Sequence, residues 1–330
     1  MAFTKKFKKQ KNFKELNDLG LGSKVIDTSQ RIITKEGKYN IERRGIPFLR
    51  SFSFYHYLIS ISWLKFCSLI LITFVIINVI FALLYLAGGV ENFEGIETTN
   101  TFDRFINEFF FSTQTFTTVG YGRINPVGVY SNIISSIESL GGLLSLALAT
   151  GLLYGRFSRP YAKILYSEKA IIAPFRDTNA FQFRIANLRE NHDMIDVEIE
   201  VILSKVVNDS RKFYNLKLEY KKISFFSASW TVNHVIDEES PIFGMTEKEL
   251  KDADVEFLIL LKGFDDTFAQ YVNSRYSYRY DEVVWGARFM NIYGKTEDGR
   301  GMVELDRLSD YETASLNQVN SLSMDTDNGN

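Results

Sequence analysis

Residues 117–122 read Thr-Thr-Val-Gly-Tyr-Gly, a segment whose backbone can bind a potassium ion. Potassium gives up its water only where about eight oxygens replace it, and four copies of such an extended segment around one axis offer rings of carbonyl oxygens. Gly120 and Gly122 can adopt backbone angles that other residues avoid, so successive carbonyls can point to one side. Thr118 adds a hydroxyl at one end of the row. This chemistry requires a membrane pore around the segment.

Two apolar runs are long enough to form that pore. Residues 66–87 are 22 almost uninterrupted apolar residues, and residues 133–154 form a second run that is richer in Ser and Gly. A membrane-spanning helix needs roughly 20 such residues. We therefore expect an outer helix over 66–87 and an inner helix over 132–156, within a pore domain over 65–158. The alternative for each run is a helix buried in a soluble core.

The charge that flanks the two runs predicts their orientation. Residues 1–50 hold 13 Lys or Arg against 5 Asp or Glu, whereas the segment between the runs is mainly acidic. Positive residues are retained in the cytoplasm. The chain is therefore expected to cross the cell membrane twice, with a basic cytoplasmic segment over 1–46, an outside loop and both termini inside. Three cations follow the second run: Arg156, Arg159 and Lys163.

The loop between the spans contains phenylalanines at three- and four-residue spacing, which favours a short helix over 102–116. A half-helix followed by extended backbone is possible inside a membrane only where protein or a water-filled cavity covers it. Four chains around an axis would provide that cover. We therefore predict a pore helix over 102–116 that leads directly into a filter over 117–122.

Residues 47–64 carry an apolar stripe interrupted by serines and His56. This pattern is typical of a slide helix lying in the membrane interface. The alternative is an N-terminal extension of the first span. His56 is either an interfacial packing residue or a proton sensor. The stripe consists of Phe52, Tyr55, Leu58 and Ile59.

From residue 159 onward the pattern changes to short strands. Residues 195–203 alternate between apolar and mostly polar side chains, which indicates a half-buried strand, and residues 255–261 indicate a more buried one. Several short strands separated by turn residues favour an all-β sandwich over 159–312. Residues 313–330 are rich in Ser, Asn and Asp, which predicts a disordered tail.

The composition excludes several classes of protein. A net charge of −2 excludes a globally basic nucleic-acid-binding protein, and a mean hydropathy of −0.08 excludes a protein made mostly of lipid-facing helices. Cys67 is the only cysteine, so no intrachain disulfide and no cysteine-based metal cluster can form. His56, His192 and His234 lie in separate contexts, which argues against a metal centre, a catalytic triad and an enzyme.

Three further blocks carry a family resemblance. Residues 156–160 read Arg-Phe-Ser-Arg-Pro, residues 234–241 read His-Val-Ile-Asp-Glu-Glu-Ser-Pro, and residues 281–289 begin Asp-Glu-Val-Val-Trp-Gly and end Arg-Phe. With residues 117–122, they make the chain resemble the inward-rectifier potassium channel family, and specifically its bacterial branch. The resemblance covers about 47–312. It implies a two-span α-helical membrane pore with pore helix and filter, a cytoplasmic Ig-like all-β sandwich domain and a homotetramer.

The resemblance also assigns the filter residues. Backbone oxygens of Thr118, Val119, Gly120 and Tyr121 would coordinate K⁺ ions, and Gly122 would allow the exit turn. It implies no cofactor besides those ions and a passive conduction of potassium.

The inner helix is expected to line the pore. Leu146, Thr150 and Tyr154 recur every four residues and so share one helix face. In the family the last such position holds a bulky residue that closes the pore, so Tyr154 is the predicted gate; the alternative is an aromatic anchor at the interface. Gly142 and Gly151 are candidate hinges, or packing sites only. Leu146 stands where strongly rectifying relatives carry an acid, so we expect weak rectification.

Two residues are expected to support the filter from behind. Glu138 is an acid within the second span, and such residues are costly and usually functional. Gln114 stands where the family generally has Glu, which removes a charge behind the filter. Arg123 after the filter also departs from the bacterial pattern and would lower the local cation concentration at the mouth, and Ser53 replaces an Asp of the slide helix.

Arg156, Arg159 and Lys163 form a juxtamembrane cluster that favours anionic phospholipids. Matching residues in the family contribute to phosphoinositide binding. The alternative is ordinary positive charge on the cytoplasmic side.

Two other functions are alternatives to a channel of this kind. A ligand-gated channel with a nucleotide-binding domain would need a Gly-x-Gly-x-x-Gly loop after a strand, and none follows residue 160. A two-span membrane sensor or scaffold whose sandwich binds a protein partner would leave residues 117–122 unexplained.

Overall fold

The chain divides into two compact units. The membrane unit is Arg44–Arg159, and the sandwich unit combines Met1–Arg43 with Pro160–Asn330. The computed structural model describes residues 31–40, 42, 44–45, 47, 53–98, 100–158, 162–189, 194–208 and 210–318.

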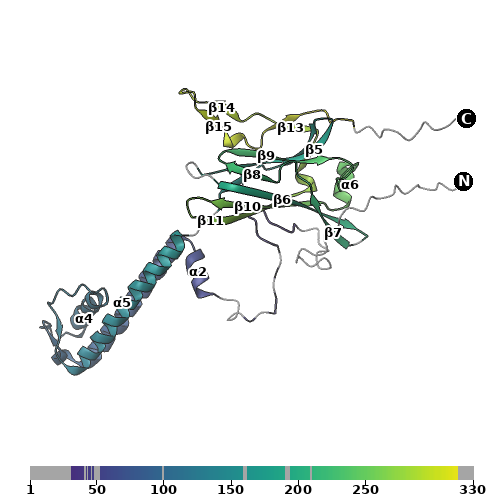
Figure 1. The fold of residues 1–330 in the computed structure, drawn as a ribbon. Coiled ribbons are helices and arrows are strands. Elements are labelled where there is room, and N and C mark those ends of the chain that lie inside the picture. Colours follow the sequence, from purple (N-terminus) through teal and green to yellow (C-terminus); the bar gives the residue numbers. More distant parts are fainter. Residues whose placement is uncertain are drawn as a thin grey trace, which may run out of the picture. The chain divides into compact units, whose positions relative to one another are not determined.

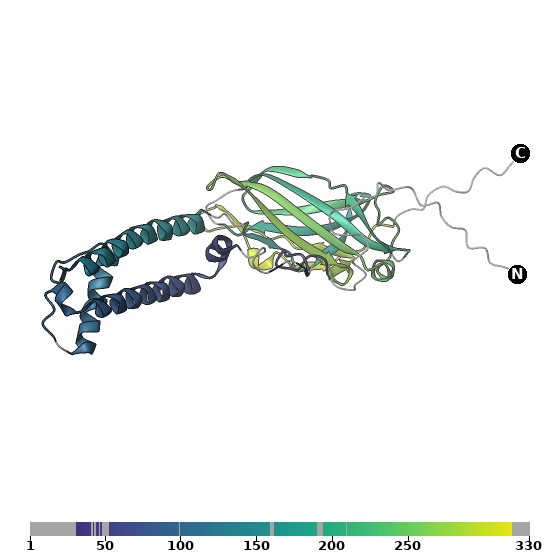
Figure 2. The same ribbon diagram turned by 90° about the horizontal axis from the view of Figure 1, so that it is seen from below.

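Two long helices make up most of the membrane unit. Helix α3 spans Trp63–Gly88 and helix α5 spans Val129–Phe157, and both are long and apolar enough to cross a membrane. Figure 2 shows them side by side, with the shorter α4, Thr101–Phe116, at the end where they are connected. Each long helix begins three residues earlier and ends one residue later than its predicted span. Gly89, at φ +93°, ends α3 in a conformation that favours glycine.

A separate short helix, α2 (Phe54–Ser60), precedes α3. The hydroxyl of Ser53 accepts a hydrogen bond from the amide of His56 at 3.3 Å, so Ser53 caps this helix as an Asp would. The backbone of Ile61 is extended and ends α2 before α3 begins. Tyr55, Leu58 and Ile59 of the apolar stripe therefore belong to a helix of their own that does not extend the first span, and Phe52 lies outside the described residues.

The loop between the long helices is closed by a small pairing. A 3₁₀ turn, η1 (Val90–Asn92), leads into β1 (Phe93–Glu94), which pairs antiparallel with β2 (Asn125–Pro126). The pore helix α4 lies between these strands in the sequence. Its first turn is capped by the side chain of Asn100, which accepts from the amide of Phe102 at 3.1 Å.

Two five-stranded sheets form the sandwich unit (Figure 1). The first has the order β11-β10-β6-β7, with β8 also paired to β6, and the second has the order β12-β4-β5-β3, with β9 also paired to β5. Only the β12–β4 pair is parallel among these. The first sheet comprises β6 (Met194–Val207), β7 (Ser210–Leu216), β8 (Lys222–Phe226), β10 (Glu256–Asp265) and β11 (Gln270–Arg279). The second comprises β3 (Ile164–Tyr166), β4 (Ala170–Phe175), β5 (Thr178–Asn187), β9 (Ser229–Ile236) and β12 (Val283–Trp285).

The core of the sandwich lies between the two sheets. Phe181 of β5 stacks on Phe257 of β10 with ring centroids 4.0 Å apart. The alternating residues Val197, Ile199 and Val201 of β6 are fully buried in the same core. The predicted combination of a two-span membrane unit with an all-β sandwich is confirmed.

Smaller elements complete the sandwich unit. Strands β13 and β16 form one antiparallel pair, and β14 and β15 form another. Their bounds, with those of the short helices, are α6 (Glu247–Asp252), η2 (Tyr280–Glu282), β13 (Ala287–Phe289), β14 (Tyr293–Lys295), β15 (Gly301–Val303), η3 (Leu305–Arg307) and β16 (Tyr311–Thr313).

The prediction of disorder over 313–330 is wrong for residues 313–318. Thr313 belongs to β16, and Leu316 packs against the sandwich core. The side-chain amide of Asn317 donates to the carbonyl of Thr178 at 2.6 Å. Composition misled the prediction because an asparagine that suits a disordered tail also satisfies backbone groups at a strand end. The remainder of the predicted tail lies outside the described residues.

A strap formed by residues 31–40 packs on the outer face of the first sheet. Its Ile32 and Ile33 are buried among three side chains of that sheet. The carboxylate of Glu256 accepts from the amides of Ile32 at 2.9 Å and Ile33 at 3.3 Å. Burial raises the pKa of Glu256, and the amide donors oppose that shift. Residues 1–30 of the predicted basic segment lie outside the described residues. The three sheet side chains are Ile202, Phe213 and Leu258.

His234 is a buried packing residue of the sandwich unit. Its Nδ1 lies 2.7 Å from the carbonyl oxygen of Lys217, and its Nε2 lies 2.7 Å from the hydroxyl of Ser240. A carbonyl can only accept, so Nδ1 carries the hydrogen and Nε2 accepts from Ser240. Burial lowers the pKa of the imidazole.

We expect His234 to make the sandwich unit less stable in acid. A lowered pKa in the folded state means that the unfolded chain binds the proton more strongly, so the free energy of unfolding falls as pH drops below about 6.5. His234→Asn does not titrate and is expected to lose this part of the fall. Denaturant unfolding of both full-length proteins in detergent, between about pH 5 and 8, measures the difference. An identical pH dependence in the two proteins would contradict the assignment.

Candidate functional site

The filter backbone alternates in handedness. The φ angles of Thr118, Gly120 and Gly122 are +59°, +51° and +78°. Positive φ is uncommon for a residue with a Cβ, so Thr118 must be held in this conformation by its surroundings. An alternation at every second residue is the backbone condition for turning successive carbonyls toward one side. The glycines therefore stand where the coordination chemistry requires them.

The last turn of α4 holds the first part of the filter. The amide of Thr118 donates to the carbonyl of Thr115 at 3.0 Å. The carbonyl of Gln114 accepts from the amides of Val119 at 2.9 Å and Gly120 at 3.3 Å. Gln114 thus supports the filter through its main chain, and the position of α4 determines the position of the filter.

Four filter carbonyls accept no hydrogen bond from the part of the chain that the structure describes. They are those of Thr118, Val119, Gly120 and Tyr121. Residues 117–123 are also exposed in the single chain. Uncovered irregular backbone is not viable at membrane depth. At membrane depth these carbonyls would need other polar partners, and the segment would need further protein around it.

An aromatic cluster fixes α4 against the outer helix. Tyr85 of α3, Phe93 of β1 and Phe111 of α4 meet edge to face, with ring centroids 5.2 to 5.3 Å apart. All three rings are buried. Each such contact adds about 0.5–1.5 kcal/mol beyond the burial of its area.

Glu138 of α5 is fully buried against the pore helix α4. Its Oε2 accepts from the hydroxyl of Tyr85 at 2.5 Å, and its Oε1 is hydrogen-bonded to Ser112 of α4. The hydroxyl of Ser112 also contacts Asn78 Oδ1 of α3 at 2.9 Å. The sequence analysis missed Tyr85, Ser112 and Asn78 as functional residues. Asn78 gave a signal, because it is the only amide side chain in the 66–87 run and must find a partner there.

Gly142 allows the inner helix to touch the end of the pore helix. A Cβ at this position would lie 2.0 Å from the carbonyl oxygen of Phe116. Helix α5 is continuous through Gly142 and Gly151, so neither of the two predicted hinges interrupts the helix in this conformation. Gly142 has a packing role, whereas a Cβ at Gly151 would meet no described atom within 4 Å apart from the neighbouring backbone of its own helix.

The predicted pore-lining residues share one face of α5. Leu146 and Thr150 are exposed along it, and the side chain of Thr150 donates to the carbonyl of Leu146 at 2.9 Å. Tyr154, one turn further, is 73% exposed. This face is therefore uncovered in a single chain and available to line a shared axis.

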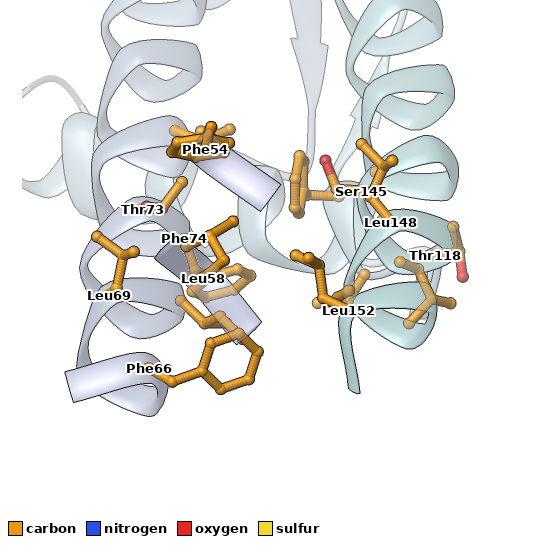
Figure 3. A pocket seen from close by; sticks show the side chains of 17 residues that line it. Phe54, Leu58, Phe66, Leu69, Thr73, Phe74, Thr118, Ser145, Leu148 and Leu152 are labelled. Carbon is orange, nitrogen blue, oxygen red and sulfur yellow. The ribbon is translucent and has the colours of Figure 1, made fainter. Parts of the chain in front are cut away.

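An apolar cavity of ≈ 410 Å³ lies below the filter within the membrane unit. Figure 3 shows side chains of α3 on one side of it, side chains of α5 on the other, and Thr118 at its edge. Such a lining offers too few polar partners to hold water or ions. In the single chain this space is therefore an apolar recess between α3 and α5. Its lining includes Phe66, Leu69, Phe74, Leu146, Leu148 and Leu152.

Arg156 joins the inner helix to the slide helix. Its guanidinium donates to the carbonyls of Leu58 at 2.6 Å and Ile61 at 2.7 Å, at the C-terminal end of α2. The same group lies over the rings of Trp63 and Phe66, with 4.6 and 4.5 Å to the ring centroids. Arg156, which the sequence predicts to bind lipid, thus makes these contacts within the membrane unit.

The structure describes only one of the other two residues that the sequence predicts to bind lipid. Lys163 is exposed in the sandwich unit. Arg159 lies outside the described residues.

Comparison with known proteins matches both units. The model described as "Inward rectifier potassium channel C-terminal domain" matches residues 164–328, and the model described as "Ion transport protein" matches residues 44–163. The chain is 37% identical over 292 residues to inward rectifier potassium channel Kirbac3.1 of Paramagnetospirillum magnetotacticum, covering 87% of this chain and 97% of that one. It is 26% identical over 302 residues to ATP-sensitive inward rectifier potassium channel 12 of Gallus gallus, covering 82% of this chain and 70% of that one.

Gly142→Ala is expected to disturb the filter. The added methyl group collides with the main chain of Phe116, and overpacking of this kind costs about 1–3 kcal/mol. The variant should lower both the thermal stability of the protein in detergent and its rubidium uptake in liposomes. Gly141→Ala is the matched control, because a Cβ there would meet no described atom within 4 Å apart from the neighbouring backbone of its own helix. Equal behaviour of the two variants would show that the close approach is not needed.

Proposed function

The chain belongs to the inward-rectifier potassium channel family, and from this premise we propose that it is a homotetrameric, potassium-selective channel of the cell membrane with both termini in the cytoplasm. The observation that carries the proposal is the filter backbone. Thr118, Gly120 and Gly122 alternate in handedness, and four consecutive carbonyls have no donor among the described residues. Such carbonyls can replace the hydration shell of K⁺.

The proposed homotetramer is supported by the surfaces that a single chain leaves exposed. Residues 117–123 and the face of Leu146, Thr150 and Tyr154 are exposed. A filter ring needs several equivalent carbonyls at one height. Four copies around the axis would complete the rings and cover both surfaces.

The gate is proposed at Tyr154. Four copies of this exposed ring near the inner end of α5 would narrow the pore sterically and exclude water from it. Arg156, two residues further, bonds the C-terminal end of α2, so a movement of the slide helix is transmitted to the helix that carries the gate. Gly142 and Gly151 are proposed to permit the bending of α5.

Anionic lipids are proposed to bias this gate through Arg159 and Lys163, with Arg156 acting mainly as the link between α2 and α5. A lipid shifts the closed–open equilibrium only if it binds one state more tightly. Leu146 offers no charge for blocking polyamines, which supports weak rectification.

A sensor or scaffold of the same architecture accounts less well for the chain. A partner-binding sandwich on two spans needs neither the alternating φ angles nor the amides anchored on Gln114. The channel explains both.

Rubidium uptake into liposomes that contain the purified protein tests the proposed function. We expect selective uptake that barium blocks. Gly120→Ser is the control, because a side chain at a residue with φ +51° strains the filter, and it should abolish uptake while the tetramer persists. If the wild type forms a tetramer and takes up no rubidium across several lipid compositions, the sensor or scaffold function is favoured instead.

Tyr154→Ala is expected to raise rubidium uptake at least about threefold in a lipid that favours the closed state, because the constriction is widened. Tyr154→Phe keeps the ring and should behave like the wild type. Unchanged uptake in Tyr154→Ala would place the gate elsewhere.

A further inference from the structure

Four buried polar side chains form one continuous chain behind the filter. They are fully buried and come from all three helices of the pore: Asn78 and Tyr85 from α3, Ser112 from α4 and Glu138 from α5. Tyr85 Oη lies 2.5 Å from Glu138 Oε2, and Glu138 Oε1 is hydrogen-bonded to Ser112 Oγ. Ser112 Oγ lies 2.9 Å from Asn78 Oδ1.

The hydrogens of this chain can be counted. It contains three contacts between oxygen atoms, and each needs one hydrogen. The hydroxyls of Tyr85 and Ser112 supply two, and Asn78 Oδ1 and an ionised carboxylate supply none. The third hydrogen must therefore sit on Glu138.

Reversing the amide of Asn78 does not remove this requirement. Asn78 Nδ2 donates to the carbonyl oxygen of Phe74 at 2.7 Å. In the reversed amide, Oδ1 would face that carbonyl with no hydrogen between the two oxygens. The orientation of Asn78 is thus determined by its own helix.

The charges around Glu138 support the same conclusion. Among the residues that the structure describes, no Lys, Arg or His forms an ion pair with Glu138, and Arg104 of the pore helix is paired with Glu108 at 3.6 Å. A fully buried carboxylate without a cation is strongly disfavoured, whereas a neutral carboxyl is tolerated.

We propose that Glu138 is a protonated positioning residue that donates to Ser112, within a relay that holds the pore helix to both spanning helices. Tyr85 donates to Glu138, Glu138 donates to Ser112, Ser112 donates to Asn78, and Asn78 donates to the Phe74 carbonyl. Every hydrogen-bonding group in the relay then has a partner.

The relay bears on selectivity because of where Ser112 stands. It lies two residues before Gln114, whose carbonyl holds two filter amides. A shift of Ser112 would therefore move the carbonyls that coordinate the ion. This role rests on the proposed function, whereas the protonation of Glu138 can be measured without any ion flux.

Infrared difference spectroscopy of the full-length protein tests the proton. The wild-type minus Glu138→Gln spectrum should show the C=O stretch of a protonated carboxyl, with a shift in D₂O. Tyr85→Phe should move this band to higher frequency, because one hydrogen bond to the carbonyl oxygen is lost; this comparison serves if Glu138→Gln does not assemble. A difference spectrum that shows carboxylate bands instead overturns the proposal.

The positioning role is tested by the ratio of rubidium to sodium uptake in liposomes. Glu138→Gln can donate to Ser112 and accept from Tyr85, so it should keep the wild-type ratio. Ser112→Ala breaks the relay and leaves two buried groups unpaired, which should lower the ratio by roughly tenfold in an intact tetramer. Ser136→Ala is the control, because among the described residues the hydroxyl of Ser136 bonds the carbonyl of Asn132 within α5 and no other group.

The outcomes separate the two proposals. A wild-type ratio in Ser112→Ala, or a lowered ratio in Glu138→Gln, overturns the positioning role. A wild-type protein that takes up no rubidium refutes the proposed function but leaves the infrared result on Glu138 intact.

Discussion

Four consecutive filter carbonyls that accept no hydrogen bond from the described residues are the constraint on which the membrane unit depends. Backbone oxygens at membrane depth are tolerated only if an ion or water satisfies them, so their positions must be maintained from behind. The chain does this through α4. Its last turn anchors filter amides on Gln114, and Gly142 brings the inner helix against the carbonyl of Phe116. The helices thus hold the strained backbone of the filter in position.

Two sets of polar contacts among the described residues of the membrane unit join different helices. Glu138 connects α5 with α3 and α4, and Arg156 connects α5 with the end of α2. In an apolar environment such contacts have no competition from water, so a small number of them can fix the relative rotation of helices whose remaining contacts are non-directional. The inner helix is the element common to both, and it also carries the face proposed to line the pore.

The sequence was sufficient to predict those elements that depend on residues close together in the chain. The spans, the pore helix and the alternating strand over 195–203 follow from the spacing of apolar residues, and the filter follows from its glycines. Contacts between distant residues could not be predicted in the same way. Which side chains meet Glu138 depends on the rotation of three helices about their axes, and a cationic cluster does not reveal that Arg156 caps a helix with its guanidinium. Residues 313–318 look like a tail by composition, yet Thr313 completes β16 and Asn317 adds hydrogen bonds to the sandwich unit.

The strap has a consequence for the order in which the protein is made. Ile32 leaves the ribosome early, but its hydrogen-bond partner Glu256 is 224 residues further along the chain. Both spanning helices are synthesised between the two. The hydrogen bonds between the strap and Glu256 therefore cannot form until both helices and most of the sandwich have been translated. Docking of the strap closes the topology of the subunit and marks a late step in its biogenesis.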